Sequence, residues 1–327
     1  MKIARPSQDL PSQDRLVTHH RTFDDIDEFT TSLSGWNADW YQIEPGRLRV
    51  RTELTQAKST AIQRYYFSHT VRQRGIAPRG AAMFGFPDQG PRHIWAGREV
   101  EGSAVMDFRN NSGYEALTES GFSALAISVP DATLASLRAQ MAIDPGRLSE
   151  DGHMPLPAVD QRHPLVRLQQ HVRRLYDRLS EERTLASSRW AMAALDRDLP
   201  VYLLTALEST RPAPRWGRSC AREKGLRRAI DFIEAKGFDN PSIPEICAAA
   251  GLSWRSLNRA FQERFGIGPK RYLTAYRLGR VRRQLKVSTP DAKVIDIAND
   301  WGFWHPGDFA RAYRGMFGEH PKDSKPD

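Results

Sequence analysis

The last third of the chain carries one pattern of hydrophobic and polar positions twice, once around Gly251 and once around Gly302. In each copy a short apolar series at helical spacing leads to the glycine, and a second apolar series at helical spacing follows it. The first copy runs from Ile243 to Phe261 and the second from Val294 to Tyr313. A glycine tolerates the sharp backbone turn that a side chain would hinder. Each copy therefore predicts a helix-turn-helix unit.

A further helical segment joins the two copies. Leu278, Val281 and Leu285 give it an apolar stripe, and basic residues occupy many of its other positions. We expect a rigid connecting helix, some of whose cations contact DNA phosphates; such contacts fix register but do not read sequence. Two such units on one spacer can reach successive major-groove faces, roughly 34 Å apart. The basic residues are Lys270, Arg271, Arg277, Arg280, Arg282, Arg283 and Lys286.

The helix after Gly251 is expected to expose side chains that suit base recognition. An arginine can bind guanine through two hydrogen bonds, and an asparagine can bind adenine in the same way. The helix after Gly302 offers less, because Pro306 and Asp308 have little to give to a base edge. We therefore expect the first unit to carry most of the base discrimination and the second to anchor the backbone. The predicted DNA-contacting residues are Trp254, Arg255, Ser256, Asn258, Arg259, Lys270, Arg271, Arg277, Arg280, Arg283, His305, Gly307, Arg311 and Arg314.

From Trp40 to Val129 the pattern changes to short alternating runs separated by Gly and Pro. Many short strands at such spacing are typical of an antiparallel sandwich or barrel, and a small barrel can hold one small ligand. Two amphipathic helices are then expected, over residues 165–179 and 190–207. Their apolar stripes fit either a cover over the barrel or a seam between two copies of the chain, and the pattern does not choose between these roles.

These segments predict an α+β fold, with an N-terminal antiparallel β-barrel and helices followed by an all-α C-terminal domain with two helix-turn-helix motifs. Residues 1–20 are polar and predict a flexible tail. Residues 21–208 are expected to form the effector-sensing and dimerisation domain. A linker rich in Pro, Gly and Arg is expected over 209–221, and the DNA-binding domain over 222–327.

Charge supports the same division of the chain. The net charge is +9, and from Arg222 onward 20 Lys and Arg face 13 Asp and Glu, so that this last part carries +7 of it. A basic domain of this kind is the electrostatic footprint of nucleic-acid binding. The two cysteines, Cys220 and Cys247, fit neither a disulfide framework nor a zinc site. With no long apolar run and no signal-peptide core, we expect a cytoplasmic protein that does not meet a membrane.

The repeated motifs resemble a known family. The residues that carry the resemblance are Ile246, Ala250, Gly251, Leu252, Ser253, Leu257 and Phe261, then Gly268, Pro269, Tyr272, Arg277 and Leu278, and then Ile297, Ala298, Gly302, Phe303, Phe309, Tyr313, Phe317 and Pro321. In this spacing the stretch 230–321 resembles the DNA-binding domain of AraC/XylS-type transcription regulators. The resemblance implies a cupin-like β-barrel sensor domain. By motif position it places base contacts at Arg255, Asn258 and Arg259, and at Pro306, Gly307, Ala310 and Arg311.

A finer likeness involves Phe265–Pro269, Val281–Leu285 and Trp301–His305. These segments are similar to the branch of the family that contains the ethanolamine-operon regulator. The effectors of that branch, ethanolamine and adenosylcobalamin, are not transferred to this chain, because no pocket residues can be matched.

We expect a sequence-specific transcription regulator, and an activator, that binds double-stranded promoter DNA under the control of a small-molecule effector. RNA polymerase is a further expected partner, and a homodimer is left open. One alternative is a DNA-binding protein without a ligand. Another is a cupin-type metal enzyme fused to a DNA-binding domain, which would need a cluster of imidazoles and carboxylates. His69 and His93 stand well apart in the strand region, so we expect no enzyme activity, no metal and no cofactor.

Overall fold

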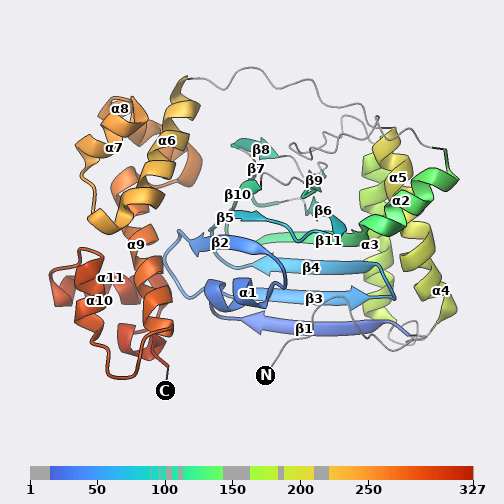
Figure 1. Cartoon of the computed structure of the whole chain (residues 1–327), viewed down its shortest axis with the longest axis horizontal. Coiled ribbons are helices and arrows are strands. Elements are labelled where there is room, and N and C mark those ends of the chain that lie inside the picture. Colours follow the sequence, from blue (N-terminus) through green and yellow to red (C-terminus); the bar gives the residue numbers. More distant parts are fainter. Residues whose placement is uncertain are drawn as a thin grey trace. The chain divides into compact units, whose positions relative to one another are not determined.

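A computed structural model describes residues 15–88, 90–95, 97–100, 105–109, 113–142, 163–182, 188–209 and 221–326 (Figure 1). The chain divides into two compact units. The strand unit comprises Met1–Trp40, Arg49–Ser68 and Gln73–Pro214, and the helical unit comprises Arg215–Asp327 with the short segments Tyr41–Leu48 and His69–Arg72. Residues 1–14 of the predicted tail and 210–220 of the predicted linker lie outside the described residues.

The strand unit is built on two sheets. The larger sheet follows the order β1 (Val17–Phe23), β3 (Val50–Gln56), β4 (Ala61–Phe67), β11 (Phe122–Pro130), β6 (Ala81–Pro87) and β9 (Met106–Asp107). Its neighbouring strands run antiparallel. The smaller sheet follows the order β2 (Asn37–Gln42), β5 (Val71–Ile76), β10 (Tyr114–Thr118), β7 (His93–Trp95) and β8 (Arg98–Val100).

The antiparallel strands are therefore confirmed, but two sequence-based expectations are wrong. In the described residues the sheets stay separate, so the cupin-like barrel does not close. The edge strands of the larger sheet are β1 and β9, those of the smaller sheet are β2 and β8, and among the described residues no edge strand of one sheet pairs with an edge strand of the other. The flexible tail also ends earlier than expected, because β1 begins at Val17 and pairs along its whole length with β3.

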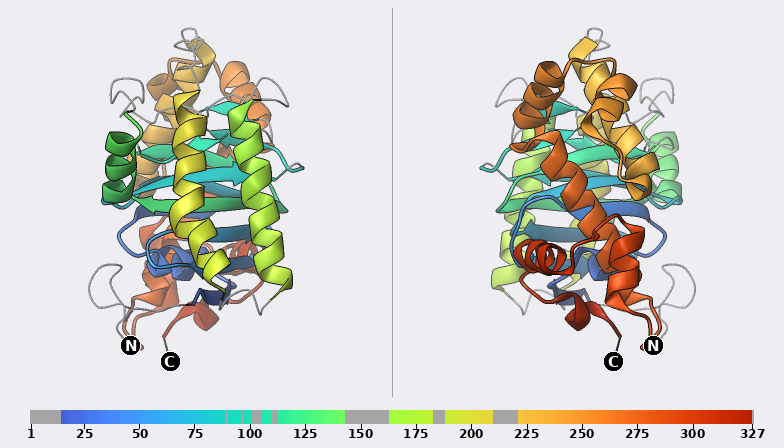
Figure 2. Two further views of the ribbon diagram at one scale, coloured as in Figure 1. Left: turned by 90° about the vertical axis from the view of Figure 1, so that its right-hand side faces the viewer. Right: turned by 90° about the vertical axis from the view of Figure 1, so that its left-hand side faces the viewer.

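Helices cover one face of the larger sheet (Figure 2). Leu165 and Val172 of α3 and Leu203 of α5 are fully buried, in one cluster with Leu125 and Ile127 of β11. Burying such a side chain stabilises the fold by about 1.5–3 kcal/mol. The amphipathic stripes thus cover the sheet, which decides between the two roles left open by their pattern. The helices of this unit are α1 (Ile26–Ser32), α2 (Asp131–Gln140), α3 (Pro164–Glu181), α4 (Arg189–Ala193) and α5 (Leu199–Glu208), with a π-helical turn at Ala194–Asp198.

The helical unit contains the two expected helix-turn-helix pairs, and α9 runs from one pair to the other (Figures 1 and 2). Ile246, Leu257 and Phe261 are fully buried at the first pair, and Ala298 and Tyr313 at the second. The elements are α6 (Ala221–Lys236), α7 (Ile243–Ala250), α8 (Trp254–Phe265), α9 (Pro269–Lys286), α10 (Val294–Asp300) and α11 (Pro306–Phe317), with 3₁₀ turns at Gly237–Asp239 and Pro321–Ser324.

Both turns have the same backbone design. Gly251 and Gly302 adopt φ values of +63° and +71°, the left-handed region that favours glycine. The residue after each glycine donates its N–H to the carbonyl five positions earlier, at 3.1 Å from Leu252 and 2.9 Å from Phe303. This bond closes the last turn of the first helix in each pair and satisfies a carbonyl that would otherwise have no partner. The glycine positions in the sequence were therefore sufficient to predict both turns.

Candidate nucleic-acid interface and cavity

The exposed face of α8 carries the side chains expected to read bases. Its N-cap, Ser253, accepts a hydrogen bond from the N–H of Ser256, which fixes the start of the helix. Trp254, Arg255 and Arg259 are exposed, and Ser256 and Asn258 are half-buried. Because Asn258 and Arg259 follow Arg255 by three and four positions, they lie on the same side of the helix as Arg255. The structure thus brings the expected base-reading residues of the first unit together.

An ion pair holds part of this face in place. Nε of Arg259 lies 2.7 Å from Oε1 of Glu263, one turn further along α8. Arg222 of α6 contacts the same carboxylate, at 3.0 Å. The hydrogen bond from Arg259 is the main reason that the pKa of Glu263 is lowered. Glu263 therefore stays charged and competes with any DNA group that Arg259 would bind.

The exposed face of α11 is poorer in polar groups. His305, Gly307, Arg311 and Arg314 are exposed, as expected. Arg311 pairs with Asp308 at 3.2 Å, and both side chains are exposed. The second, fifth and sixth residues of α8 are Arg255, Asn258 and Arg259. In α11 the same places hold Gly307, Ala310 and Arg311.

The basic residues of α9 divide into two groups. Lys270 and Arg271 are exposed near the start of the helix, and Arg280 and Arg283 are half-buried further along. Arg277 is only 6% exposed, and burial lowers its pKa to about 10. Its guanidinium donates to the backbone carbonyl of Trp301 and to the side chain of Asn240 and lies 4.4 Å from the centre of the Phe303 ring. The prediction that Arg277 contacts DNA is therefore corrected, because its donors are used inside the unit.

Arg277 belongs to a feature that occurs at both turns. At the first turn, Arg228 of α6 donates to the carbonyl of Ala250, the residue before Gly251. At the second turn, Arg277 of α9 donates to the carbonyl of Trp301, the residue before Gly302. Each arginine satisfies a carbonyl at a helix end and brings positive charge to the negative end of the helix dipole. Sequence reasoning missed these two contacts, although an arginine precedes each turn glycine at similar spacing.

The second helices of the two helix-turn-helix pairs, α8 and α11, are called the probe helices below. An exposed tryptophan lies at or just before the start of each. Trp254 begins α8 and is 51% exposed, and Trp304 lies two residues before α11 and is 67% exposed. Most other large aromatic side chains in the described residues are buried to a greater extent. Trp304 was not among the residues expected to contact DNA.

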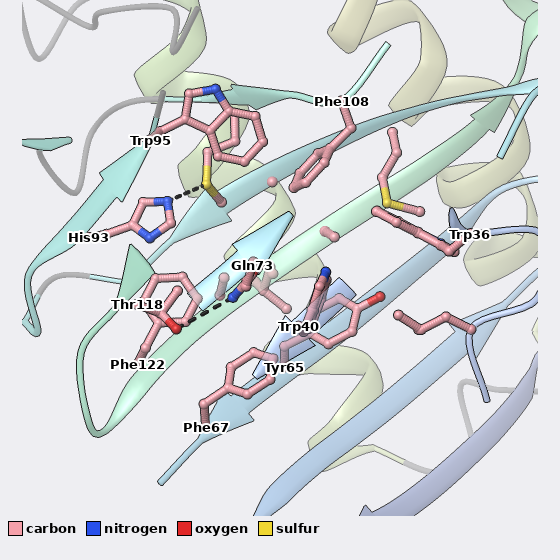
Figure 3. A pocket seen from close by; sticks show the side chains of 17 residues that line it. Trp36, Trp40, Tyr65, Phe67, Gln73, His93, Trp95, Phe108, Thr118 and Phe122 are labelled. Carbon is pink, nitrogen blue, oxygen red and sulfur yellow. Dashed lines mark hydrogen bonds between the residues drawn. The ribbon is translucent and has the colours of Figure 1, made fainter. Parts of the chain in front are cut away.

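The strand unit contains a cavity that is partly open to solvent (Figure 3). Its lining residues come from both sheets and surround about 530 Å³ of empty space, part of which is open solvent. Trp36, Trp95 and Phe108 form part of an aromatic wall. Gln73 and Thr118 face the same space, with 3.4 Å between Nε2 and Oγ1. Sequence reasoning predicted a ligand-binding domain but named no residue of this cavity.

The match to a protein-family model lies in the helical unit. A helix-turn-helix domain family matches residues 246–325. The XylDLEGF operon transcriptional activator 1 of Pseudomonas putida is 38% identical over 102 residues, which are 30% of this chain and 30% of that protein. The probable thc operon regulatory protein of Rhodococcus erythropolis is 34% identical over 99 residues, again 30% of each. The C-terminal helical domain belongs to the AraC/XylS family of transcription regulators.

A probable AraC family transcriptional regulator from Rhodopseudomonas palustris, whose crystal structure is known, is 31% identical in sequence to this chain. The match covers 31% of this chain and 98% of that one, with a TM-score of 0.30. This chain spans about 30% of the length of the curated relatives named above. Among the described residues, no helix combines the length and apolarity needed to cross a lipid bilayer. Within the same residues, no three His, Cys, Asp or Glu side chains gather in a metal-binding arrangement.

Proposed function

We propose that the chain is a transcriptional activator whose AraC-type domain binds promoter DNA and whose strand unit binds a small-molecule effector. The observation that carries this proposal is the pair of helix-turn-helix units, each with an exposed probe helix, joined by α9. The 18 residues of α9 make a rod of about 27 Å, at 1.5 Å per residue. That length is close to the DNA repeat of roughly 34 Å and suits probes that enter successive major grooves.

The two probe helices divide the work unequally. On α8, Arg255, Asn258 and Arg259 supply donors and acceptors that match guanine and adenine. On α11 the glycine and alanine at the matching places leave two cations, Arg314 and Arg311, and Arg311 is paired with Asp308. We therefore infer that α8 reads most of the sequence and that α11 anchors the phosphate backbone. The surface formed by Lys270, Arg271, Arg280 and Arg283 adds phosphate contacts along α9.

Two further partners belong to the proposal. An activator increases transcription by contacting RNA polymerase at the promoter, so we propose RNA polymerase as a partner of the AraC-type domain. A second copy of the chain would place two pairs of probe helices on one promoter. The number of chains bound to one DNA fragment tests whether the protein binds as a homodimer. Cytoplasmic location follows from this function.

The segments 265–269, 281–285 and 301–305 support a place near the ethanolamine-operon regulators. They lie in the helical unit and include parts of α9 and the second turn. The likeness to this branch therefore concerns the DNA-binding half of the chain and does not identify the effector.

The experiment measures binding of the full chain to a DNA fragment selected from a random pool, by fluorescence anisotropy, against a scrambled fragment. Arg255→Ala and Arg259→Ala should each weaken specific binding by about 1–3 kcal/mol and relax preference at one base pair. Arg283→Ala should weaken binding to both fragments alike. The control is Arg167→Ala, which removes an exposed arginine of the strand unit and should leave binding unchanged. If Arg255→Ala and Arg259→Ala both bind like the wild type, the proposed reading helix is wrong.

A further inference from the structure

The cavity of the strand unit has a wall without charged side chains. None of its lining residues is Asp, Glu, Lys or Arg in the part of the chain that the structure describes. The one histidine on the wall, His93, is 3% exposed. Burial lowers its pKa to about 3, and a hydrogen bond with the backbone of Leu117 opposes this only in part. The imidazole is therefore neutral at physiological pH, and Tyr65, whose pKa burial raises, is neutral as well.

An uncharged wall restricts what can enter. A charged group moved from water into this space would lose its hydration and gain no counter-ion. Such a transfer costs several kcal/mol even after the protein relaxes. A carboxylate or an ammonium group is therefore excluded from the interior of the cavity, and a ligand that fills it is uncharged there.

The wall is also rich in aromatic rings, and Phe108 meets two of them edge to face. The ring centres of Trp95 and Phe108 lie 4.7 Å apart at an interplanar angle of 86°. Those of Trp36 and Phe108 lie 5.8 Å apart at 75°. Edge-to-face contacts are a preferred geometry of aromatic pairs. A flat aromatic ligand can extend this arrangement, with its ring edge directed at one wall ring and its face at another.

Three polar side chains form a row at the other part of the cavity (Figure 3). Gln73, Thr118 and His93 come from β5, β10 and β7, which are neighbours in the smaller sheet. Thr118 and His93 are direct partners in the pairing of β10 with β7. All three are buried. The contact between Gln73 and Thr118 is long, at 3.4 Å, so that a ligand group can replace it without loss of a strong bond.

We propose that this cavity binds an uncharged, planar aromatic molecule that carries one hydrogen-bonding group, such as a carboxamide. The polar group would lie against Gln73 and Thr118, and the ring would lie among Trp36, Trp95 and Phe108. This inference rests on the proposed effector control, because it names the chemical class of the effector. The ligand class requires only that the strand unit binds the ligand, whereas effector control also requires DNA binding by the helical unit.

Two small ligands of matched size separate the effect of ligand charge from that of ligand shape. Benzamide and benzoate have nearly the same size, and only benzoate is charged at neutral pH. Binding to the full chain is followed by quenching of tryptophan fluorescence and by the shift in thermal unfolding temperature. Trp36, Trp40 and Trp95 line the cavity and report occupancy. We expect benzamide to bind at least about tenfold more tightly than benzoate, and cyclohexanecarboxamide, which lacks the aromatic ring, to bind more weakly than benzamide.

Isosteric variants test the polar row. Thr118→Val removes a hydroxyl and keeps the shape, and it should weaken benzamide binding by about tenfold. Gln73→Leu should do the same, while toluene, which needs no polar partner, should bind both variants at least as well as the wild type. Trp190→Phe changes an exposed tryptophan of α4 and should leave benzamide affinity unchanged.

Each outcome decides something. Benzoate binding as tightly as benzamide, no benzamide binding at all, or unchanged affinity in folded Thr118→Val and Gln73→Leu would overturn the ligand class. None of these results would affect the DNA-binding test with Arg255→Ala and Arg259→Ala. Conversely, benzamide binding that follows the expected pattern would support the ligand class even if Arg255→Ala and Arg259→Ala left DNA binding unchanged.

Discussion

A Cβ atom on Gly302 would lie 2.5 Å from Nη2 of Arg277, closer than such atoms can approach. The guanidinium cannot easily move away, because it is bonded to the carbonyl of Trp301 and to Asn240. At the first turn the matching distance, from a Cβ on Gly251 to Nη2 of Arg228, is 3.1 Å. The two turns therefore share a design but differ in how tightly the arginine fills them.

Gly302→Ala should accordingly destabilise the helical unit more than Gly251→Ala. Both place an L-residue at positive φ, which costs about 1–2 kcal/mol. Gly302→Ala adds the displacement of a buried arginine, for a total of about 2–4 kcal/mol. Hydrogen exchange of the α9 and α10 amides in the full chain measures the local stability. Equal effects of the two substitutions would show that Arg277 is not fixed as described.

The pair Arg259–Glu263 predicts an unusual gain of affinity. Glu263→Gln removes a carboxylate from the reading helix and releases Arg259 for DNA. We expect tighter binding and a salt dependence steeper by about one unit in the logarithmic plot, because the surface that faces the DNA gains one net positive charge. Binding is measured by anisotropy between about 50 and 200 mM salt.

Asp308→Asn is the matched control for Glu263→Gln, because it breaks the equivalent pair with Arg311 on α11. It should also raise affinity, but without a change in base preference. Glu263→Gln should alter the preference at one base pair. Weaker binding of Glu263→Gln would contradict the account and would mean that the ion pair holds Arg259 in its binding pose.

His93 makes the strand unit sensitive to acid. Its pKa is about 3 in the folded chain against 6.5 for an ordinary histidine. Between these values the unfolded chain binds a proton that the folded chain does not. The contribution of His93 to the free energy of unfolding is therefore full above about pH 6.5. It decreases as the pH is lowered, by up to about 1.4 kcal/mol per pH unit. Urea unfolding followed by near-ultraviolet circular dichroism of the aromatic wall measures this slope.

The variant His93→Gln should remove most of that slope between about pH 6.5 and 5 and leave the part contributed by His171, whose pKa is also lowered by burial. His19→Gln, which changes an exposed histidine of β1, should keep the full slope. A wild-type slope that survives in His93→Gln would assign the acid sensitivity to other groups.

The sequence predicted what depends on local pattern. Turn glycines and apolar spacing are properties of a few consecutive residues, and they located both helix-turn-helix pairs. The same reasoning placed Arg277 on DNA, because a count of charges cannot distinguish a cation in solvent from one bonded to a backbone carbonyl.

The cavity lay beyond sequence reasoning for a different reason. Gln73, Thr118 and His93 are far apart in the chain and meet only because β5, β10 and β7 are neighbours in the smaller sheet. No periodicity reveals which strands pair when many short strands are available. The barrel expectation failed for a related reason, since closure depends on the pairing of edge strands, which the pattern did not define.

The central claim is that α8 and α11 enter successive major grooves of one duplex. Methylation protection on a selected DNA fragment tests it most directly, because guanine N7 lies in the major groove. If both probe helices enter the major groove, two patches on one face of the DNA are protected, about one helical turn apart. Arg255→Ala and Arg259→Ala should weaken protection mainly in one of these patches. Protection of a single patch, or of two patches on opposite faces, would contradict the claim.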